Sequence, residues 1–142
     1  MKIIFLCTGN SARSQIAEGF TRDLKEKIYK DKNLVILSAG VVSPKPVNPL
    51  SIKVMAEKGI DLTGYRSKSI DDIDLMNADY IITLCGDAKD NCPYVGAKTK
   101  NLHWDLLDPA NAEGSEEEKL NFFRKIRDEI EIRIRDFLKT II

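Results

Sequence analysis

The amino-acid sequence predicts an α/β fold, a single-domain four-stranded parallel sheet flanked by helices that spans residues 1–142. Short, nearly continuous apolar runs at 2–6, 34–37 and 80–84 are typical of parallel strands covered on both faces. Stretches with apolar residues at helical spacing lie between them, which calls for right-handed crossovers between parallel neighbours. A chain of 142 residues is long enough for one buried core and too short for two ordinary domains.

The helices are predicted from periodicity and capping signals. Apolar residues at four-residue steps predict a helix over 14–29. Asn48 before Pro49 is typical of a helix start, and we expect this helix to end at Gly59. Ser115 and Glu118 form a capping box that opens a long amphipathic helix with apolar positions through 141.

The remaining segments carry weaker signals. We expect 65–69 to be irregular, 70–76 to form a short helix and 102–103 to be a short fourth strand. Residues 86–98 are polar and rich in turn formers, so we expect a mobile segment with one marginal helical turn.

Composition narrows the function classes. The 22 basic and 22 acidic residues leave no net field that would attract nucleic acid or an anionic membrane. The first apolar run is too short for a signal-peptide core, and no run approaches membrane-spanning length. We therefore expect a cytoplasmic monomer. Three cysteines cannot all pair within one chain, so the odd count indicates reactive or metal-binding thiols rather than structural disulfides.

A loop directly after the first strand carries the strongest chemical signal. It comprises Cys7, Thr8, Gly9, Asn10, Ser11, Ala12, Arg13 and Ser14. The five residues between Cys7 and Arg13 let the chain curl once around a tetrahedral anion and aim backbone N–H groups and a helix start at it. Arg13 adds a planar fork of donors for two oxygens. The same positive field favours the nucleophilic thiolate at Cys7.

The backbone types in this loop support that interpretation over a merely buried cysteine at a strand end. Gly9 and Asn10 are residues that adopt left-handed backbone conformations. Such conformations are what a tight anion-binding loop requires. We therefore predict that the loop is an oxyanion cradle with Cys7 as its nucleophile.

Two further thiols, Cys85 and Cys92, follow the strand at 80–84. Carboxyl ends of parallel strands meet at one edge, so Cys85 and Cys7 are expected to face one crevice, which indicates redox chemistry. Six residues separate Cys85 from Cys92, and a disulfide can form if the loop contracts. Small buried fillers are the alternative. A zinc site would need a fourth ligand, and His103 is interpreted as a strand or loop residue with a satisfied hydrogen bond.

Asp108 is the candidate general acid. It precedes Pro109 in a loop at the same sheet edge, and the proline stiffens the turn that would aim the carboxyl group at the cradle. A neighbouring thiolate and oxyanion favour a carboxyl that keeps its proton, as protonation of a leaving oxygen requires. Asp105 is the rival, and a turn or capping role is the alternative for either residue.

These residues resemble the thioredoxin-coupled arsenate reductases built on the low-molecular-weight protein tyrosine phosphatase fold. The likeness covers essentially the whole chain, at 7–15, 17–19, 38–40, 83–87, 91–93, 103–104, 108–110 and 127–130. The loop and Asp108-Pro109 are shared with the phosphatases, whereas the pair Cys85 and Cys92 is specific to the reductases. The resemblance implies a flavodoxin-like strand order.

The resemblance also implies a reaction. Cys7 attacks arsenate, Asp108 protonates the leaving hydroxide, and Cys85 then attacks the Cys7 sulfur, which releases arsenite. Cys92 next carries the oxidation to a disulfide with Cys85, and reduced thioredoxin is the electron donor, with no bound cofactor and no metal. Ser14 hydrogen-bonds the thiolate, Asn10 holds the loop and Ser11 assists.

Two departures from the family pattern bear on the site. Ala12 stands where relatives often carry a further cysteine, which leaves the three-thiol relay untouched. Relatives that bind potassium near Asn10, Glu18 and Ser38 often complete that site with a threonine and an aspartate where Arg66 and Lys68 align here. We expect the Lys68 ammonium to take that space and neutralise Glu18, with a solvated lysine as the alternative.

Two rival functions remain at this point. The cradle and Asp108 would equally serve a low-molecular-weight protein tyrosine phosphatase that hydrolyses phosphomonoesters through a phosphocysteine at Cys7. Ala110 stands where such phosphatases usually carry an aromatic residue, and the other two thiols would have no role in them. The second rival is an anion-binding module that passes a phosphate from Cys7 to a partner.

Overall fold

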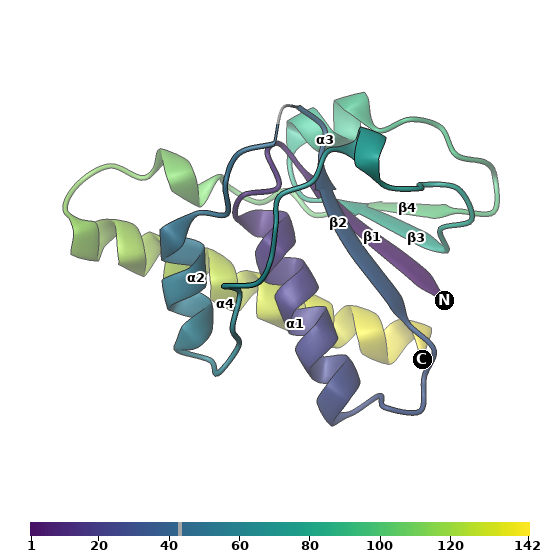
Figure 1. Ribbon diagram of the computed structural model, residues 1–142, viewed down its shortest axis with the longest axis horizontal. Coiled ribbons are helices and arrows are strands. Elements are labelled where there is room, and N and C mark those ends of the chain that lie inside the picture. The colour runs from purple at the N-terminus through teal and green to yellow at the C-terminus, as the bar shows by residue number, and fades with distance from the viewer. Residues whose placement is uncertain (43) are drawn as a thin grey trace.

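The sheet of the computed structural model, which describes residues 1–42 and 44–142, confirms the predicted fold class. Its four strands are β1 (Lys2–Cys7), β2 (Val35–Gly40), β3 (Tyr80–Thr83) and β4 (Lys100–His103). They are all parallel and lie in the order β2-β1-β3-β4, the flavodoxin-like arrangement (Figure 1). Apolar residues fill β1 because it is central and covered on both faces.

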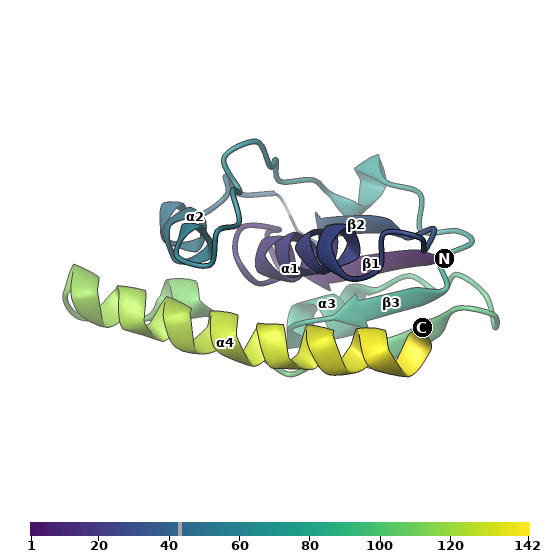
Figure 2. The same ribbon diagram turned by 90° about the horizontal axis from the view of Figure 1, so that it is seen from below.

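Four helices accompany the sheet: α1 (Arg13–Lys27), α2 (Pro49–Ala56), α3 (Gly86–Asn91) and α4 (Glu116–Ile141). The long helix α4 runs beside α1, and the two pack against each other along the sheet (Figure 2). Phe137 of α4 meets Tyr80 and Trp104 edge to face, with ring centroids 5.1 and 5.9 Å apart. In the part of the chain that is described, no helix combines the length and apolarity needed to cross a membrane.

The register of the strands separates two faces of the sheet. Leu6 pairs with Thr83, and Thr83 pairs with His103, so these three side chains share one face. Cys7 is the next residue along β1 and therefore points to the opposite face. The carboxyl ends of β1 and β3 thus present chemically distinct groups on either side of one edge.

The capping predictions are confirmed. Asn48 accepts a hydrogen bond from the Leu50 amide at the start of α2, and Ser115 and Glu118 form the capping box of α4. Gly59 has a φ of +76° after α2, the left-handed conformation that glycine adopts without strain. Helix α3 extends the single turn that was expected at 86–98 to six residues.

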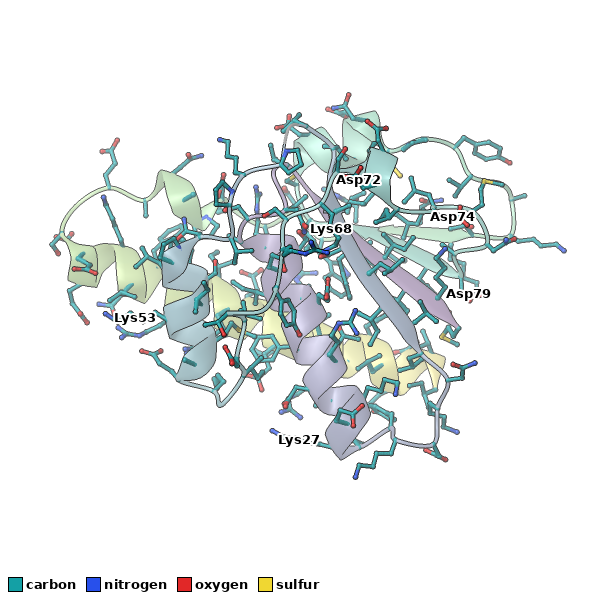
Figure 3. All side chains as sticks on the ribbon, viewed as in Figure 1. Lys27, Lys53, Lys68, Asp72, Asp74 and Asp79 are labelled. Carbon is teal, nitrogen blue, oxygen red and sulfur yellow. The ribbon has the colours of Figure 1, made fainter. Side chains whose placement is uncertain are left out.

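The helix predicted at 70–76 is wrong. Only Ile70–Asp72 forms a 3₁₀ turn, closed by a capping box from Ser69. The turn ends at Ile73, whose backbone is extended, with φ −125° and ψ 155°. The Met76 amide then donates to the Asp74 carboxylate at 2.9 Å in place of a helical carbonyl. Figure 3 labels Asp72 and Asp74 in this connection. A nearby side-chain acceptor competes here with the helical hydrogen bond.

Glu57, beyond the end of α2, joins that helix to α4. Its carboxylate accepts hydrogen bonds from Arg124 and Arg127, with nitrogen to oxygen distances of 2.7 Å to each. Hydrogen bonding to Arg124, with a further contribution from Arg127, lowers the pKa of Glu57 to about 2. Arg127 also donates to the Val54 carbonyl, so this network fixes the two helices against each other.

Candidate active site

The predicted cradle forms a small cavity where β1 ends and α1 begins. The cavity has a volume of about 60 Å³, enough for an ion of a few heavy atoms. Its lining comprises Cys7, Thr8, Gly9, Ser11, Ala12, Arg13, Lys45, Asp108 and Ala110. Within the described residues, no side chain caps α1 at Ala12. The first amides of α1 therefore stay available to an anion.

A chain of hydrogen bonds under the cradle ends on the thiol. Ser38 donates to the Glu18 carboxylate at 2.6 Å, so its oxygen accepts from the Asn10 amide at 3.0 Å. The same amide nitrogen donates to Ser14 Oγ at 2.7 Å. That leaves the Ser14 proton for Cys7 Sγ, 2.8 Å away. The direction of the whole chain therefore stabilises a negative charge on Cys7.

Asn10 is held by its other contacts. Its side-chain oxygen accepts from the Lys68 backbone amide at 2.8 Å and from Gln15 at 3.0 Å, which fixes the orientation of the amide group. Its φ of 51° lies in the left-handed region, as predicted. Gly9 is able to take that conformation but does not use it here: among the described residues of this loop, a left-handed φ occurs only at Asn10.

Gly40 at the end of β2 supports the loop from below. A Cβ at this position would lie 2.8 Å from the Thr8 carbonyl oxygen and 2.9 Å from the Gly9 carbonyl carbon. These are backbone atoms, which cannot swing aside as a flexible side chain can. The close approach of two backbones therefore requires glycine.

Arg13 and Asp108 meet at the rim of the cavity. Arg13 is 6% exposed, donates to the Leu106 carbonyl at 3.1 Å and lies 3.5 Å from one Asp108 carboxylate oxygen. The other Asp108 oxygen accepts from the Ala110 amide at 3.0 Å and caps the turn at Pro109–Asn111. Asp108 thus serves as a cap and faces the cradle. Asp105, the rival, does not line this cavity.

Cys85 is linked to the cradle by Thr8. Its Sγ lies 3.2 Å from the Thr8 hydroxyl and accepts from the Ala88 amide at 3.3 Å as the N-cap of α3. The Thr8 hydroxyl also donates to Asp87 at 3.4 Å. The second thiol therefore rests against the residue that follows Cys7, although it does not line the cradle cavity itself.

Cys92 lies apart from the other two thiols. All three cysteines are free, and α3 separates Cys92 from Cys85. Seven helical steps span about 10 Å, which exceeds the roughly 7 Å between Cα atoms that a disulfide tolerates. The structure does not bring these two sulfurs together. Burial raises the pKa of the Cys92 thiol.

The expected ammonium lies beside Glu18. Lys68 Nζ is 3.9 Å from one carboxylate oxygen and donates to the Arg66 carbonyl at 2.8 Å (Figure 3). Desolvation lowers the pKa of Lys68 even though Glu18 opposes this. Arg22 binds the other Glu18 oxygen at 2.8 Å. These cations occupy the carboxylate, so the residues do not fit a resident potassium ion. In the described part of the chain no His, Cys, Asp and Glu cluster could hold a metal.

Three features of the site escaped sequence reasoning. Lys45 lines the cradle, and its only sequence signal is its place between Pro44 and Pro46, which stiffen the loop. Arg22 pairs with Glu18 one helical turn away, a spacing that was visible in the sequence. The contact of Thr8 with Cys85 joins residues 77 apart in sequence and had no local signal.

Comparison with known families defines the class of the protein. The family model of the low molecular weight phosphotyrosine protein phosphatases matches residues 2–142. The chain belongs to this family.

Its relatives narrow the comparison further. The arsenate reductase of Bacillus licheniformis is 49% identical over 138 residues, which cover 97% of this chain and 95% of the relative. A solved arsenate reductase in the phosphate-binding state is 30% identical, with a TM-score of 0.81, and covers 99% of this chain and 98% of its own. The thioredoxin-dependent arsenate reductase of Corynebacterium glutamicum is 28% identical, with a TM-score of 0.73, over 99% of this chain and 61% of that one.

Proposed function

We propose that this protein reduces arsenate to arsenite, with Cys7, Cys85 and Cys92 as a thiol relay and reduced thioredoxin as electron donor. The bond between the Thr8 hydroxyl and Cys85 Sγ carries the proposal, because it holds a second thiol against the residue next to the nucleophile. Identity of 49% with an arsenate reductase and the likeness to a thioredoxin-dependent one support it. The proposed relay starts from three reduced thiols, and because the cytoplasm keeps thiols reduced, we propose a cytoplasmic location.

The first step takes place in the cradle. The Cys7 thiolate, stabilised by Ser14, attacks arsenic, and Arg13 and the loop amides of Thr8, Gly9, Asn10, Ser11 and Ala12 hold the oxygens. Asp108 gives its proton to the departing hydroxide, which leaves as water. The entering anion competes for Arg13, which frees Asp108 from the 3.5 Å contact seen here.

The second step transfers two electrons. The Cys85 thiolate attacks the Cys7 sulfur, the sulfur to arsenic bond breaks, and its electron pair reduces arsenic to the trivalent state. Arsenite leaves, and a disulfide joins Cys7 to Cys85. The Ala88 amide donates to Cys85 Sγ and holds this sulfur beside Thr8 for the step.

The third step moves the disulfide outward. Cys92 attacks Cys85, Cys7 departs as a thiolate, and thioredoxin then reduces the bond between Cys85 and Cys92. Helix α3 has to unwind for this exchange, because it separates the two thiols. Five of its six residues are exposed, and isolated helices of this length are unstable, so the cost of unwinding is small.

A coupled assay with arsenate, thioredoxin, thioredoxin reductase and NADPH tests the proposal. We expect sustained NADPH oxidation in the wild type and none in Cys7→Ser, Cys85→Ser or Cys92→Ser. Equal turnover in Cys92→Ser would show that the third step is wrong.

A phosphatase that acts through a Cys7 phosphocysteine is the second candidate. The lining of the cradle cavity supports a phosphatase, because neither Cys85 nor Cys92 lines that cavity. Attack of Cys7 on a bound phosphoester would therefore need neither of these two thiols. Retained hydrolysis of p-nitrophenyl phosphate in Cys85→Ser, with arsenate reduction lost, would separate the two activities.

A further inference from the structure

A second cavity lies on the other side of the sheet edge from Cys7. It has a volume of about 320 Å³ and is lined by the ends of β3 and β4 and by the segment that follows α3. The lining residues are Thr83, Lys89, Cys92, Pro93, Tyr94, Asn101, Leu102 and His103. Of the described residues, none lines both this cavity and the cradle. The side chains around Cys92 are therefore different from those that line the cradle.

The Cys92 thiol has to lose a proton before it can attack a disulfide, because the thiolate is the nucleophile. Burial raises the pKa of this thiol and so opposes the loss. Its hydrogen-bond partner is the Pro93 carbonyl oxygen, at 3.6 Å from Sγ. A carbonyl oxygen cannot take up the proton, so a base in the same cavity would speed its loss.

His103, the single histidine of the chain, presents such an acceptor. Its Nδ1 lies 2.8 Å from the Thr83 hydroxyl. The Thr83 hydroxyl also lies 3.3 Å from the Leu102 carbonyl, and in the tautomer in which it donates there, Nδ1 carries the imidazole proton and donates to Thr83. Nε2 is thereby left with a free lone pair. The satisfied hydrogen bond predicted for His103 thus occupies only one of its two nitrogens.

The charges around the ring suit a proton acceptor. Asp105 Oδ1 lies 4.0 Å from Nε2, within reach of the ring once that nitrogen carries a proton. Lys89 of α3 and Tyr94 line the same cavity. Thr83 is 5% exposed and anchors the ring from β3.

His103 also lies beside the route that Cys92 has to take. His103 pairs with Thr83 across neighbouring strands, which lie about 4.8 Å apart. Cys85 follows Thr83 by two residues, about 7 Å further along. His103 is the last residue of β4, so it lies at the edge of the sheet where Cys92 would meet Cys85 once α3 unwinds.

We propose that His103 is the general base of the third relay step and takes the Cys92 thiol proton on Nε2. This inference rests on the proposed function. The thiolate then attacks Cys85, the new bond joins Cys92 to Cys85, and the bond from Cys85 to Cys7 breaks. Cys7 keeps the electron pair as a thiolate, and the imidazolium later gives its proton to water. No net oxidation occurs in this step.

A single-turnover experiment tests the role of His103 in the variant His103→Asn, whose amide keeps the hydrogen bond to Thr83. Reduced enzyme is mixed with arsenate without thioredoxin, quenched with an alkylating agent and analysed by mass spectrometry at several pH values. We expect an unchanged release of one equivalent of arsenite and a conversion of the Cys7 to Cys85 disulfide slowed by about 10- to 100-fold at pH 7. The deficit should shrink as pH rises towards the titration of the thiol, since hydroxide then replaces the base.

The control is Tyr94→Phe, which alters the same cavity lining without removing an acceptor that works near neutral pH, and it should convert at the wild-type rate. A wild-type rate and pH profile in His103→Asn would overturn the proposal, as would equal slowing in Tyr94→Phe. Failure of the proposed function gives a different result, because the wild type itself would then form no disulfide with Cys92.

Discussion

The cradle and the α3 segment lie at the same sheet edge and differ in nearly every physical respect. Asn10, Ser14 and Ser38 are fully buried, and each makes hydrogen bonds within one directed network. In α3, only Ala88 is buried, and the rest of the six-residue helix faces solvent. Recognition of an anion needs donors fixed in advance, whereas export of a disulfide needs a segment that reshapes at little cost. The molecule keeps the two requirements on separate elements.

Arg13→Lys should have the largest effect. A lysine cannot present two parallel donors to an oxyanion and cannot reach Leu106 and Asp108 together as Arg13 does. We expect kcat/KM for arsenate to fall by about 100-fold or more in the coupled assay. Arg124→Lys is the matched control, since Arg124 pairs with Glu57 and does not line the cradle, and it should be near wild type. Comparable losses in both variants would contradict a specific role for Arg13.

Gly40→Ala tests whether the cradle is as rigid as its contacts indicate. The added methyl would meet the Thr8 carbonyl oxygen at 2.8 Å and force the loop to move. Overpacking of this kind costs about 1–3 kcal/mol, so we expect a lower melting temperature and a loss of activity of about 10-fold or more. Gly64→Ala, where a Cβ would have no neighbour within 4 Å, is the control. Wild-type activity in Gly40→Ala would mean that the loop adapts freely.

The sequence predicts the features that depend on local residue patterns and misses those that depend on side-chain contacts in the folded protein. The strands and the loop from Cys7 to Ser14 follow from apolar runs and local spacing, the strand order follows from the family resemblance, and the structure confirms the fold. The helix predicted at 70–76 failed because Ile73 is extended and the Asp74 side chain binds the Met76 amide, a local alternative that the apolar pattern does not reveal. Thr83 and His103 have no local pattern that reveals their contact, since parallel strands pair residues distant in sequence.

Glu57→Gln should affect stability and spare the relay. Glu57 is bound by Arg124 and Arg127, and because its carboxylate is partly exposed the network stabilises the fold by about 1 kcal/mol or less. Its pKa falls from 4.5 to about 2 on folding, so this stabilisation is present above pH 4.5 and is lost as pH falls to about 2. Denaturant titrations should show the variant weaker at pH 7 and equal to the wild type near pH 2. A constant difference across that window would exclude the titration of Glu57 as the cause.

Gly86→Ala should have the smallest effect and bears on α3 alone. A Cβ at Gly86 has open space around it, and alanine favours a helix by roughly 0.5–1 kcal/mol over glycine. A more stable α3 should slow formation of the Cys85 to Cys92 disulfide by about two- to five-fold, because the helix must unwind first. The preceding release of arsenite should keep its rate. Faster disulfide formation in this variant would argue that a folded α3 assists the exchange.

The central claim is that the cradle stays fixed while α3 unwinds and lets Cys92 reach Cys85. Disulfide mapping after one turnover tests this claim most directly. Wild-type protein is treated with arsenate in the absence of thioredoxin, alkylated, digested and analysed by mass spectrometry. The account predicts one bridge, between Cys85 and Cys92, with Cys7 recovered as the alkylated thiol. A final product in which Cys7 stays bridged and Cys92 is alkylated would contradict it.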